Sequence, residues 1–277
     1  MMDFKFGSRT YIMGILNVTP DSFSGDGIYQ DADKAVETGE RLVQEGADII
    51  DIGGESTRPG AQSVTIEEEI KRVIPVIEKL SKKIKAPISI DTAKSEVARQ
   101  ALDSGASIVN DITGLESDPE MVYIIREFNA KVVLMHIKGT PQTMQNSPEY
   151  GNLIKEIKEE LRRIIDKAIL NGIKKENIII DPGIGFGKTL KHNLEILNRL
   201  SEFKELGMPV LVGPSRKSFI GKITGAEPDN RVFGTAGAVA IAIENGADIV
   251  RVHDVKEIKQ AVMIADAIIR FKGNKNE

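Results

Sequence analysis

Cysteine is absent from the 277 residues of this chain, and its absence excludes several kinds of chemistry. Without cysteine the protein has no disulfide bond, no thiolate metal site and no cysteine nucleophile. Histidine is scarce as well, with three residues that are widely spaced along the chain. None of them forms the closely spaced pair that is typical of zinc sites. Candidate site residues are therefore sought among carboxylates, amides, lysines and arginines.

Long apolar runs and strong net charge are also missing. The longest apolar run, Val232 to Ile243, has 12 residues and is too short to span a bilayer. The N-terminal residues lack the apolar core of a signal peptide, since Asp3, Lys5 and Arg9 interrupt it. A net charge of −4 gives no general attraction to nucleic acid or acidic membranes. These absences predict a cytoplasmic protein with no nucleic-acid or membrane partner.

Short β-branched runs alternate with longer segments of helical period along the whole chain. The runs are mostly continuously apolar, which is typical of strands buried on both faces of a parallel sheet. The eight predicted strands are 10–17, 48–52, 88–91, 107–110, 131–136, 177–181, 210–213 and 248–253. Because about 250 residues suffice for a (β/α)8 barrel, we predict an α/β fold, a (β/α)8 TIM barrel forming a single domain over residues 1–277. A doubly wound open sheet is the alternative.

Two local patterns support repeated strand–helix units. Residues 153–170 place their apolar side chains on one stripe of a helix, and Asn171-Gly172 supplies a left-handed stop. A glycine followed by a short turn and a strand recurs at Gly46, Gly105 and Gly246. Long glycine-rich loops with hydroxyl side chains follow strands 1 and 2, at 19–27 and 53–60. Such loops are typical of lids that close over a substrate, although plain solvated loops have a similar composition.

Polar residues stand at the carboxyl ends of all eight strands. These ends meet at one mouth of a (β/α)8 barrel, where active sites are built. Helix capping or turn formation is the alternative for any single Asp or Asn. The residues concerned are Asn17, Asp51, Asp91, Asn110 with Asp111, His136, Asp181, Ser215 to Lys217, and Arg251 with His253.

Two glycine-containing segments differ in what they predict. Residues 181–189 resemble a nucleotide-binding loop, but Pro182 and Lys188 stand where the two common patterns need glycine. That segment instead predicts a carboxylate, Asp181, followed by a turn that lets a flat ligand approach the backbone. Residues 213–218 supply hydroxyls, amides and two cations after strand 7, where barrels often bind phosphate. A solvated basic turn is the alternative there, and His192 is predicted to be structural on a helix surface.

Carboxylates and amides suit a polar heterocycle, and Arg, Lys and His suit an anion. The residues therefore predict displacement of a phosphate-type leaving group from a heterocyclic substrate.

The same segments resemble the motifs of the dihydropteroate synthase family. The resemblance spans Met13 to Asp254 in the family's order, without a departure at a motif position. The matching blocks are Asn17-Val-Thr-Pro-Asp-Ser-Phe-Ser24, Gly53-Gly-Glu-Ser-Thr-Arg-Pro-Gly60, Ile90-Asp-Thr92, Asn110-Asp-Ile-Thr-Gly114, Asp181-Pro-Gly-Ile-Gly-Phe-Gly-Lys-Thr189, Ser215-Arg-Lys-Ser218 and Arg251-Val-His-Asp254.

The resemblance implies transfer of a dihydropterin-methyl group from its pyrophosphate to p-aminobenzoate, with Mg2+ as cofactor and a homodimer as the assembly. The implied route is SN1-like: pyrophosphate leaves first, and Asp91 and Asp181 stabilise the pterin cation. With Lys217 they are the implied catalytic residues. The implied pterin pocket consists of Asp91, Asn110, Ile112, Met135, Asp181 and Lys217. The remaining implied roles are metal binding by Asn17, pyrophosphate binding by Arg251 and His253, aminobenzoate contacts by Ser218, Phe186 and Pro59, and lid positions for Asp21, Ser22, Phe23, Thr57 and Arg58.

A second function stays open. Pterin-binding methyltransferase domains, which present methyltetrahydrofolate to a corrinoid protein, share the barrel and the pterin-pocket Asp and Asn. They handle no pyrophosphate, so the basic residues after strands 7 and 8 favour the synthase.

Overall fold

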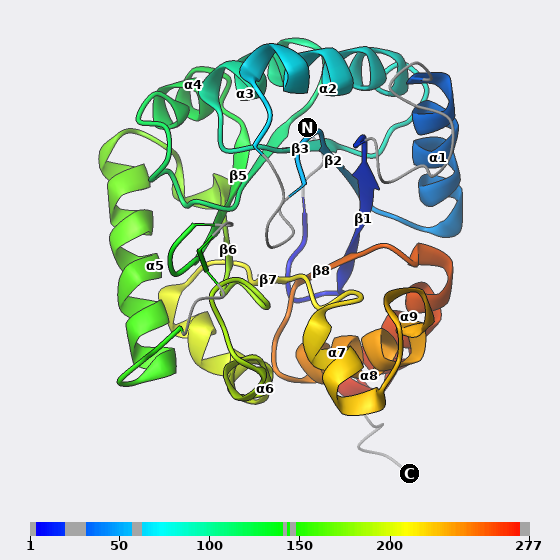
Figure 1. The fold of residues 1–277 in the computed structure, drawn as a ribbon, viewed down its shortest axis with the longest axis vertical. Coiled ribbons are helices and arrows are strands. Elements are labelled where there is room, and N and C mark those ends of the chain that lie inside the picture. The colour runs from blue at the N-terminus through cyan, green and yellow to red at the C-terminus, as the bar shows by residue number, and fades with distance from the viewer. Residues whose placement is uncertain (1–3, 20–31, 57–62, 141–142, 145–147, 272–277) are drawn as a thin grey trace.

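Eight parallel strands form a ring with helices around its outside (Figure 1). A computed structural model describes residues 4–19, 32–56, 63–140, 143–144 and 148–271. Its strands are β1 (Tyr11–Asn17), β2 (Ile49–Gly53), β3 (Ile88–Asp91), β4 (Ile108–Asp111), β5 (Lys131–Met135), β6 (Ile178–Asp181), β7 (Leu211–Val212) and β8 (Ile249–Val252). Their order is β6-β5-β4-β3-β2-β1-β8-β7. A parallel bridge between Ile180 and Val210 joins the two ends of the sheet, so the predicted barrel is confirmed and the open sheet is wrong.

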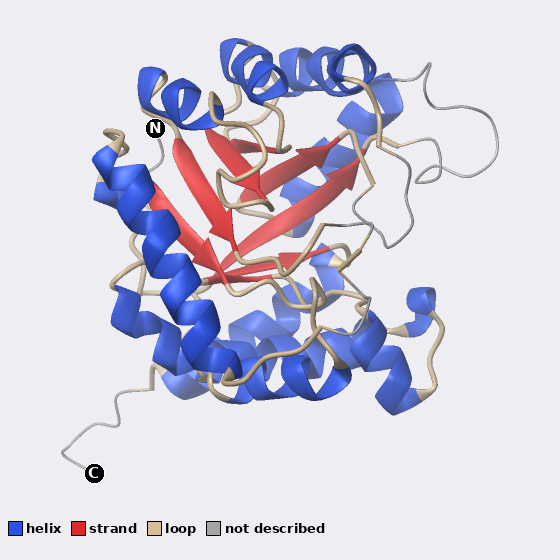
Figure 2. Cartoon of the chain, turned by 60° about the vertical axis from the view of Figure 1, so that its left-hand side comes forward, coloured by secondary structure: helices blue, strands red, loops and turns tan. Residues whose placement is uncertain are grey.

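The helices cover the outer face of the strands (Figure 2). They are α1 (Ala32–Glu45), α2 (Ile66–Leu80), α3 (Ser95–Asp103), α4 (Met121–Glu127), α5 (Leu153–Leu170), α6 (Leu190–Asn198), α7 (Ser218–Thr224), α8 (Val232–Glu244) and α9 (Val255–Ile269). Two helices, α7 and α8, lie between β7 and β8, where a simple repeat predicts one. Of the loops predicted at 19–27 and 53–60, residues 20–27 and 57–60 lie outside the described residues.

The three repeated glycines end their helices in the same way. Gly46, Gly105 and Gly246 have φ values of 114°, 114° and 99°. A side chain is strained in this region, so glycine is favoured where the chain leaves a helix and turns into a strand. The repeated sequence pattern therefore marks a repeated backbone geometry.

Two apolar layers hold the barrel together. The larger one fills the space between strands and helices. The smaller one fills the barrel interior, with side chains from seven of the strands. Its members are Phe4, Tyr11, Met13, Ile49, Ile108, Val133, Ile179, Leu211 and Ile249. Since side chains alternate along a strand, the residue two positions beyond each interior residue also points inward, toward the mouth.

Helix α5 offers a direct test of the packing. Leu161 on its buried stripe is fully covered, whereas Leu170 at its end is 85% exposed. We expect Leu161→Ala to lower the free energy of unfolding by about 2–5 kcal/mol, because it leaves a cavity between helix and sheet. Leu170→Ala should change it by only about 0.5 kcal/mol or less. Urea denaturation measures both, and equal losses would contradict the burial pattern.

Candidate active site

The mouth of the barrel carries a polar layer directly above the apolar interior. Asp51, Asn110, Asp181 and Arg251 each stand two residues after an interior isoleucine of the same strand. Asp91 joins them from β3, where the strand register places it beside Asn110. Because side chains alternate between the two faces of a strand, the same inward-facing position on five strands brings five polar side chains to one place.

Arg251 reaches across the mouth and holds two carboxylates together. Its Nε donates to Asp51 Oδ2 at 2.6 Å, and its Nη2 donates to Asp91 Oδ2 at 2.7 Å. Asn110 Nδ2 also donates to Asp51 Oδ2, at 3.0 Å. Burial raises the pKa of Asp91 to about 7, although Arg251 acts in the opposite direction. The pKa of Arg251 is raised because the two carboxylates outweigh the effect of burial.

Asp181 and Lys217 form the other side of the polar layer. Asp181 Oδ1 accepts from the Gly183 backbone N–H at 2.7 Å, and burial raises the Asp181 pKa to about 6. Burial lowers the pKa of Lys217 to about 8. The Lys217 ammonium lies 4.1 Å from the ring centroid of Phe186, a cation–π contact. Asp181 thus stabilises the predicted turn through Oδ1 alone. Its Oδ2 has no hydrogen-bond partner in the described part of the chain.

An apolar wall adjoins these polar groups. Ile112, Met135, Met144 and Phe186 form a separate small cluster at the mouth. The register places Met135 beside Asp181. A flat heterocycle can therefore rest on apolar atoms while its edge meets carboxylates, an amide and an ammonium, as is usual for small-molecule sites.

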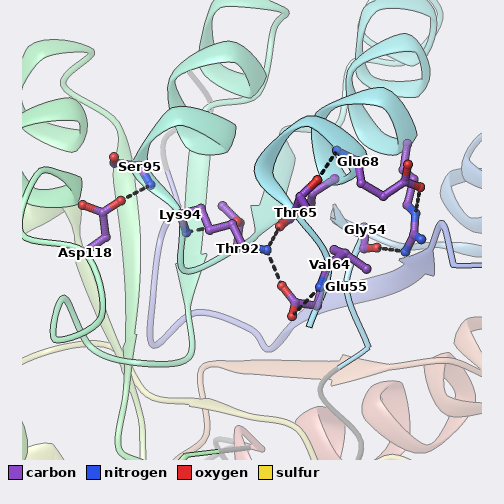
Figure 3. Close-up of polar contacts among 11 residues, drawn as sticks. Gly54, Glu55, Val64, Thr65, Glu68, Thr92, Lys94, Ser95 and Asp118 are labelled. Atoms are coloured by element: carbon purple, nitrogen blue, oxygen red, sulfur yellow. Dashed lines mark hydrogen bonds and ion pairs between the residues drawn. The ribbon is translucent and has the colours of Figure 1, made fainter. Parts of the chain in front are cut away.

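A cavity of about 370 Å3 opens beside Asp91. One wall contains Lys94, whose Nζ donates to Glu55 at 2.5 Å (Figure 3). The same Nζ donates to the buried Glu69 at 2.5 Å. Glu55 also accepts from the Val64 backbone N–H at 3.4 Å. Residues 55 and 64 flank the loop after β2, so this carboxylate connects the two ends of that loop.

The loop after β7 differs in part from its prediction. Arg216 does not serve as a second free cation, because it pairs with Asp254 and Asp229. Ser215 Oγ lies 3.0 Å from His253 Nδ1, and burial lowers the pKa of His253 to about 3. His253 is therefore neutral at pH 7 and can offer a hydrogen bond rather than a charge. Ser218 is exposed at the first position of α7.

Several predicted site residues lie outside the described residues. These are Asp21, Ser22, Phe23, Thr57, Arg58 and Pro59. The other predicted site residues belong to the polar layer, the apolar wall or the ends of the elements beside them, with Asn17 ending β1 and Ser218 beginning α7. His192 caps α6 reciprocally with Thr189, in agreement with its predicted structural role.

Asn17 is the single residue predicted to hold a metal. Its Oδ1 lies near Gly53, which also neighbours the Asp91 carboxylate. Among the residues that the structure describes, no group of three His, Cys, Asp or Glu side chains could hold a metal ion. Mg2+ commonly uses one or two protein oxygens together with waters and substrate phosphates. An amide oxygen at this place fits that pattern, with the substrate as the main source of ligands.

Two further residues occupy the site or its border. Asp51, predicted at the mouth without a specific role, is fully buried at the centre of the Arg251 network, and Lys188, which has no predicted role, is 3% exposed after the glycine turn. The signal for Asp51 is its place two residues after Ile49. Lys188 has no comparable signal, because its contacts come from the loop geometry.

No helix in the described part of the chain is long and apolar enough to cross a membrane.

The chain matches known proteins over almost its whole length. The family model for pterin binding enzymes matches residues 13–253. A dihydropteroate synthase of Synechocystis is 52% identical over 268 residues, covering 96% of this chain and 93% of that protein. A Clostridium difficile dihydropteroate synthase, solved in the presence of pteroic acid, has a TM-score of 0.92 and 47% identity, covering 97% and 100% of the two chains. That of Xanthomonas albilineans, with 4-aminobenzoic acid, has a TM-score of 0.90 and 44% identity, covering 95% and 94%.

Proposed function

This chain belongs to the pterin binding enzyme family, as a dihydropteroate synthase, and we propose that the polar layer of the barrel mouth is its pterin site. The substrates are a dihydropterin pyrophosphate and p-aminobenzoate, in keeping with the ligands of the solved relatives. One observation carries the assignment of the site. Asp91, Asn110 and Asp181 face inward two residues beyond buried strand positions, beside an apolar wall.

The pterin edge complements this layer. Its 2-amino group and N3–H are donors that suit the Asp181 carboxylate, whereas its O4 and ring nitrogens accept from Lys217 and Asn110. Hydrogen bonds to charged groups contribute about 1.5–3 kcal/mol each. Met135 and Phe186 would contact the faces of the ring. The arrangement would hold the pterin with its methylene carbon toward the open mouth.

The reaction breaks the bond between the methylene carbon and the pyrophosphate oxygen, and the pyrophosphate leaves with the bonding electrons. Asp91 and Asp181 stabilise the resulting pterin cation, because fixed carboxylates are already oriented toward it. The amine nitrogen of p-aminobenzoate then bonds to the carbon and releases one proton to water. No side chain has to act as a nucleophile.

The leaving group would be handled by neighbouring residues. Bound Mg2+ would supply Lewis-acid stabilisation of the pyrophosphate charge, with Asn17 as its protein ligand. His253 would donate one hydrogen bond, and Ser218 would lie near the aminobenzoate. The roles that the resemblance implies for Asp21, Ser22, Phe23, Thr57, Arg58 and Pro59 stay predictions.

The direct experiment incubates the protein with 6-hydroxymethyl-7,8-dihydropterin pyrophosphate, p-aminobenzoate and Mg2+. We expect equal amounts of pyrophosphate and 7,8-dihydropteroate, and neither product when the pterin substrate is omitted. Omitting Mg2+ tests the cofactor separately. Binding of methyltetrahydrofolate without any pyrophosphate release would instead favour the corrinoid-linked binding domain.

We also propose a homodimer formed through α8 and α9. Helix α8 is apolar around its whole circumference, which is unusual for a helix with one face in solvent. Phe233, Gly237 and Ile241 follow one line on its exposed side, and Ile264 and Ile268 are exposed on α9 beside it. Large apolar side chains grouped in this way are typical of protein interfaces.

The cytoplasmic location stays a prediction.

Phe233, which is 86% exposed, provides the test. We expect Phe233→Glu to shift the protein from dimer to monomer in sedimentation velocity, because it places a charge in an apolar interface. Leu170→Glu is the matched control, since Leu170 is equally exposed but lies on α5. A monomeric wild-type protein, or a dimer that survives Phe233→Glu, would contradict this interface.

A further inference from the structure

Lys188 is a buried cation that the proposed reaction does not use. It is 3% exposed and follows the glycine turn after β6. Its Nζ lies 3.0 Å from His136 Nδ1, 2.8 Å from the Phe186 carbonyl oxygen and 3.4 Å from the His136 carbonyl oxygen. All three acceptors are neutral when His136 is neutral. No carboxylate of the described residues forms a salt bridge with Lys188.

The tautomer of His136 follows from this contact. A protonated lysine is a donor only, so His136 Nδ1 has to accept and its proton has to be on Nε2. Burial and the charge of Lys188 both lower the pKa of His136, which keeps the ring neutral. A buried histidine and a buried lysine thus fit together without an acidic partner.

These bonds connect two segments of the pterin site. His136 follows β5 directly after Met135, and its backbone N–H donates to the Asp181 carbonyl at 2.9 Å. Phe186 belongs to the loop after β6, and its ring contacts the Lys217 ammonium. The fit is close, since a Cβ on Gly183 would lie 2.0 Å from the His136 carbonyl oxygen. Lys188 therefore fixes the loop that carries Asp181 and Phe186 against the end of β5.

Its charge acts on the same site. The cations that lower the pKa of Asp181 are Lys217, Lys188 and Arg251, while burial raises it. Lys217 follows β7 and Arg251 lies in β8, whereas Lys188 belongs to the same loop as Asp181. Lys188 is 3% exposed, and its Nζ is used by contacts with His136 and Phe186.

We propose that Lys188 is a positioning residue of the pterin site, which fastens the loop after β6 to β5 and supplies a positive charge close to Asp181. This inference rests on the proposed pterin site. Lys188 acts through Asp181 and Phe186 and is distinct from the residues that bind the substrates.

The test compares Lys188→Met and Lys188→Gln with the wild-type protein. Both variants remove the charge, and glutamine retains hydrogen-bond donors for the carbonyl groups. Tyr150→Phe is the matched control, because Tyr150 donates to the Gly187 carbonyl of the same loop at 3.0 Å without carrying a charge. Calorimetry with 6-hydroxymethylpterin, which has no pyrophosphate, measures the pterin site alone at pH 6.5 and 8.5.

The expected result depends on pH. The charged form of Asp181 binds the pterin, and its pKa of about 6 should rise when Lys188 is lost. If the Asp181 pKa rises by about one unit, the variants should therefore bind more weakly by about threefold at pH 6.5, because the ionised fraction of Asp181 falls from about three-quarters to about one-quarter. At pH 8.5 the loss should be much smaller, because Asp181 is ionised in all the proteins. Burial also lowers the pKa of Lys188 to about 7, so the wild-type charge is largely gone at that pH.

Two outcomes would overturn the proposal: equal losses at both pH values, or the same profile for Tyr150→Phe. If Lys188→Met does not fold, as judged by thermal melting, Lys188→Gln decides the question. Pyrophosphate release by the wild-type protein is measured separately. A wild-type protein that binds the pterin but releases no pyrophosphate would disprove the proposed reaction and leave the comparison of Lys188 variants valid.

Discussion

Arg251→Met should lower the free energy of unfolding by about 3–5 kcal/mol, the usual cost of removing one partner from a buried ion pair. The guanidinium is the shared partner of Asp51 and Asp91, at 2.6 and 2.7 Å. Asp51 is fully buried, so its charge cannot be compensated by water once Arg251 is gone. Urea denaturation measures the loss, which should be among the largest for any single substitution in the chain.

The loss should grow with pH. Burial and the charge of Asp51 raise the pKa of Asp91 above the unfolded value of about 3.9, and this pKa should rise further when Arg251 is removed. The folded variant then binds more protons than its unfolded form, so its stability falls as pH rises through that interval. In the wild-type protein the Asp91 pKa is about 7, and Arg251 is what opposes a higher value. The difference between the two proteins should therefore be larger at pH 8.5 than at pH 6.

Arg251→Lys is the control for this prediction. Lysine keeps the charge but loses the two-pronged geometry, so it should recover part of the stability. A loss for Arg251→Met that is the same at both pH values would show that packing, and not the charge of the carboxylates, is responsible. Because Arg251 is also implied to bind the pyrophosphate, Arg251→Met should weaken binding of the pterin pyrophosphate far more than binding of a bare pterin.

Asp181→Asn should reduce pterin affinity and lower turnover. The amide keeps the shape, and its oxygen can still accept from the Gly183 N–H. Its NH2 group then faces the pterin donors, and leaving such buried groups unpaired costs about 1–3 kcal/mol. The pterin cation also loses a fixed negative charge. Removing one preorganised electrostatic group, such as an oxyanion-hole donor, costs other enzymes about 10²–10³-fold in rate, and we expect a loss of similar size here. Pyrophosphate release at saturating pterin and calorimetry with a bare pterin measure the two effects.

Asp111→Asn separates this effect from a structural one. Asp111 is 1% exposed at the end of β4 and faces away from the pterin site. Its oxygens accept from the backbone N–H groups of Thr113 and Leu115 at 2.8 and 2.9 Å. Asp111→Asn should lower stability and leave pterin affinity almost unchanged. In Asp181→Asn, the affinity for p-aminobenzoate in the presence of pterin and pyrophosphate should change little. If only this affinity fell, Asp181 would belong to the aminobenzoate site and not to the pterin site.

The strands and helices could be predicted because their signals are local. A continuous apolar run marks β6, and the stripe from Ile154 to Ala168 marks α5, whose bounds are those predicted. Neighbours along the chain decide these patterns, through side-chain direction and the need to bury one face. The position of the site at the strand ends followed as well, because parallel strands in a barrel all point their carboxyl ends the same way.

The partners of each polar residue could not be predicted in this way. Asp111 and Asn110 are adjacent in sequence, yet one caps a turn and the other enters the mouth, since neighbours on a strand face opposite sides. Arg216 follows β7 and Arg251 lies in β8. Arg216 pairs with Asp254, whereas Arg251 spans the mouth to Asp51 and Asp91.

By itself, then, the sequence determined the barrel, its strand ends and the family to which the chain belongs. Only the tertiary structure decided which carboxylates share Arg251, that His253 is neutral, and that Lys188 lies buried against His136. The physical reason is that charge and hydrogen bonding depend on distance and burial in space. These distances are set by the closure of the ring, which brings β8 near β2 and β3 across some 200 residues of chain between Asp51 and Arg251.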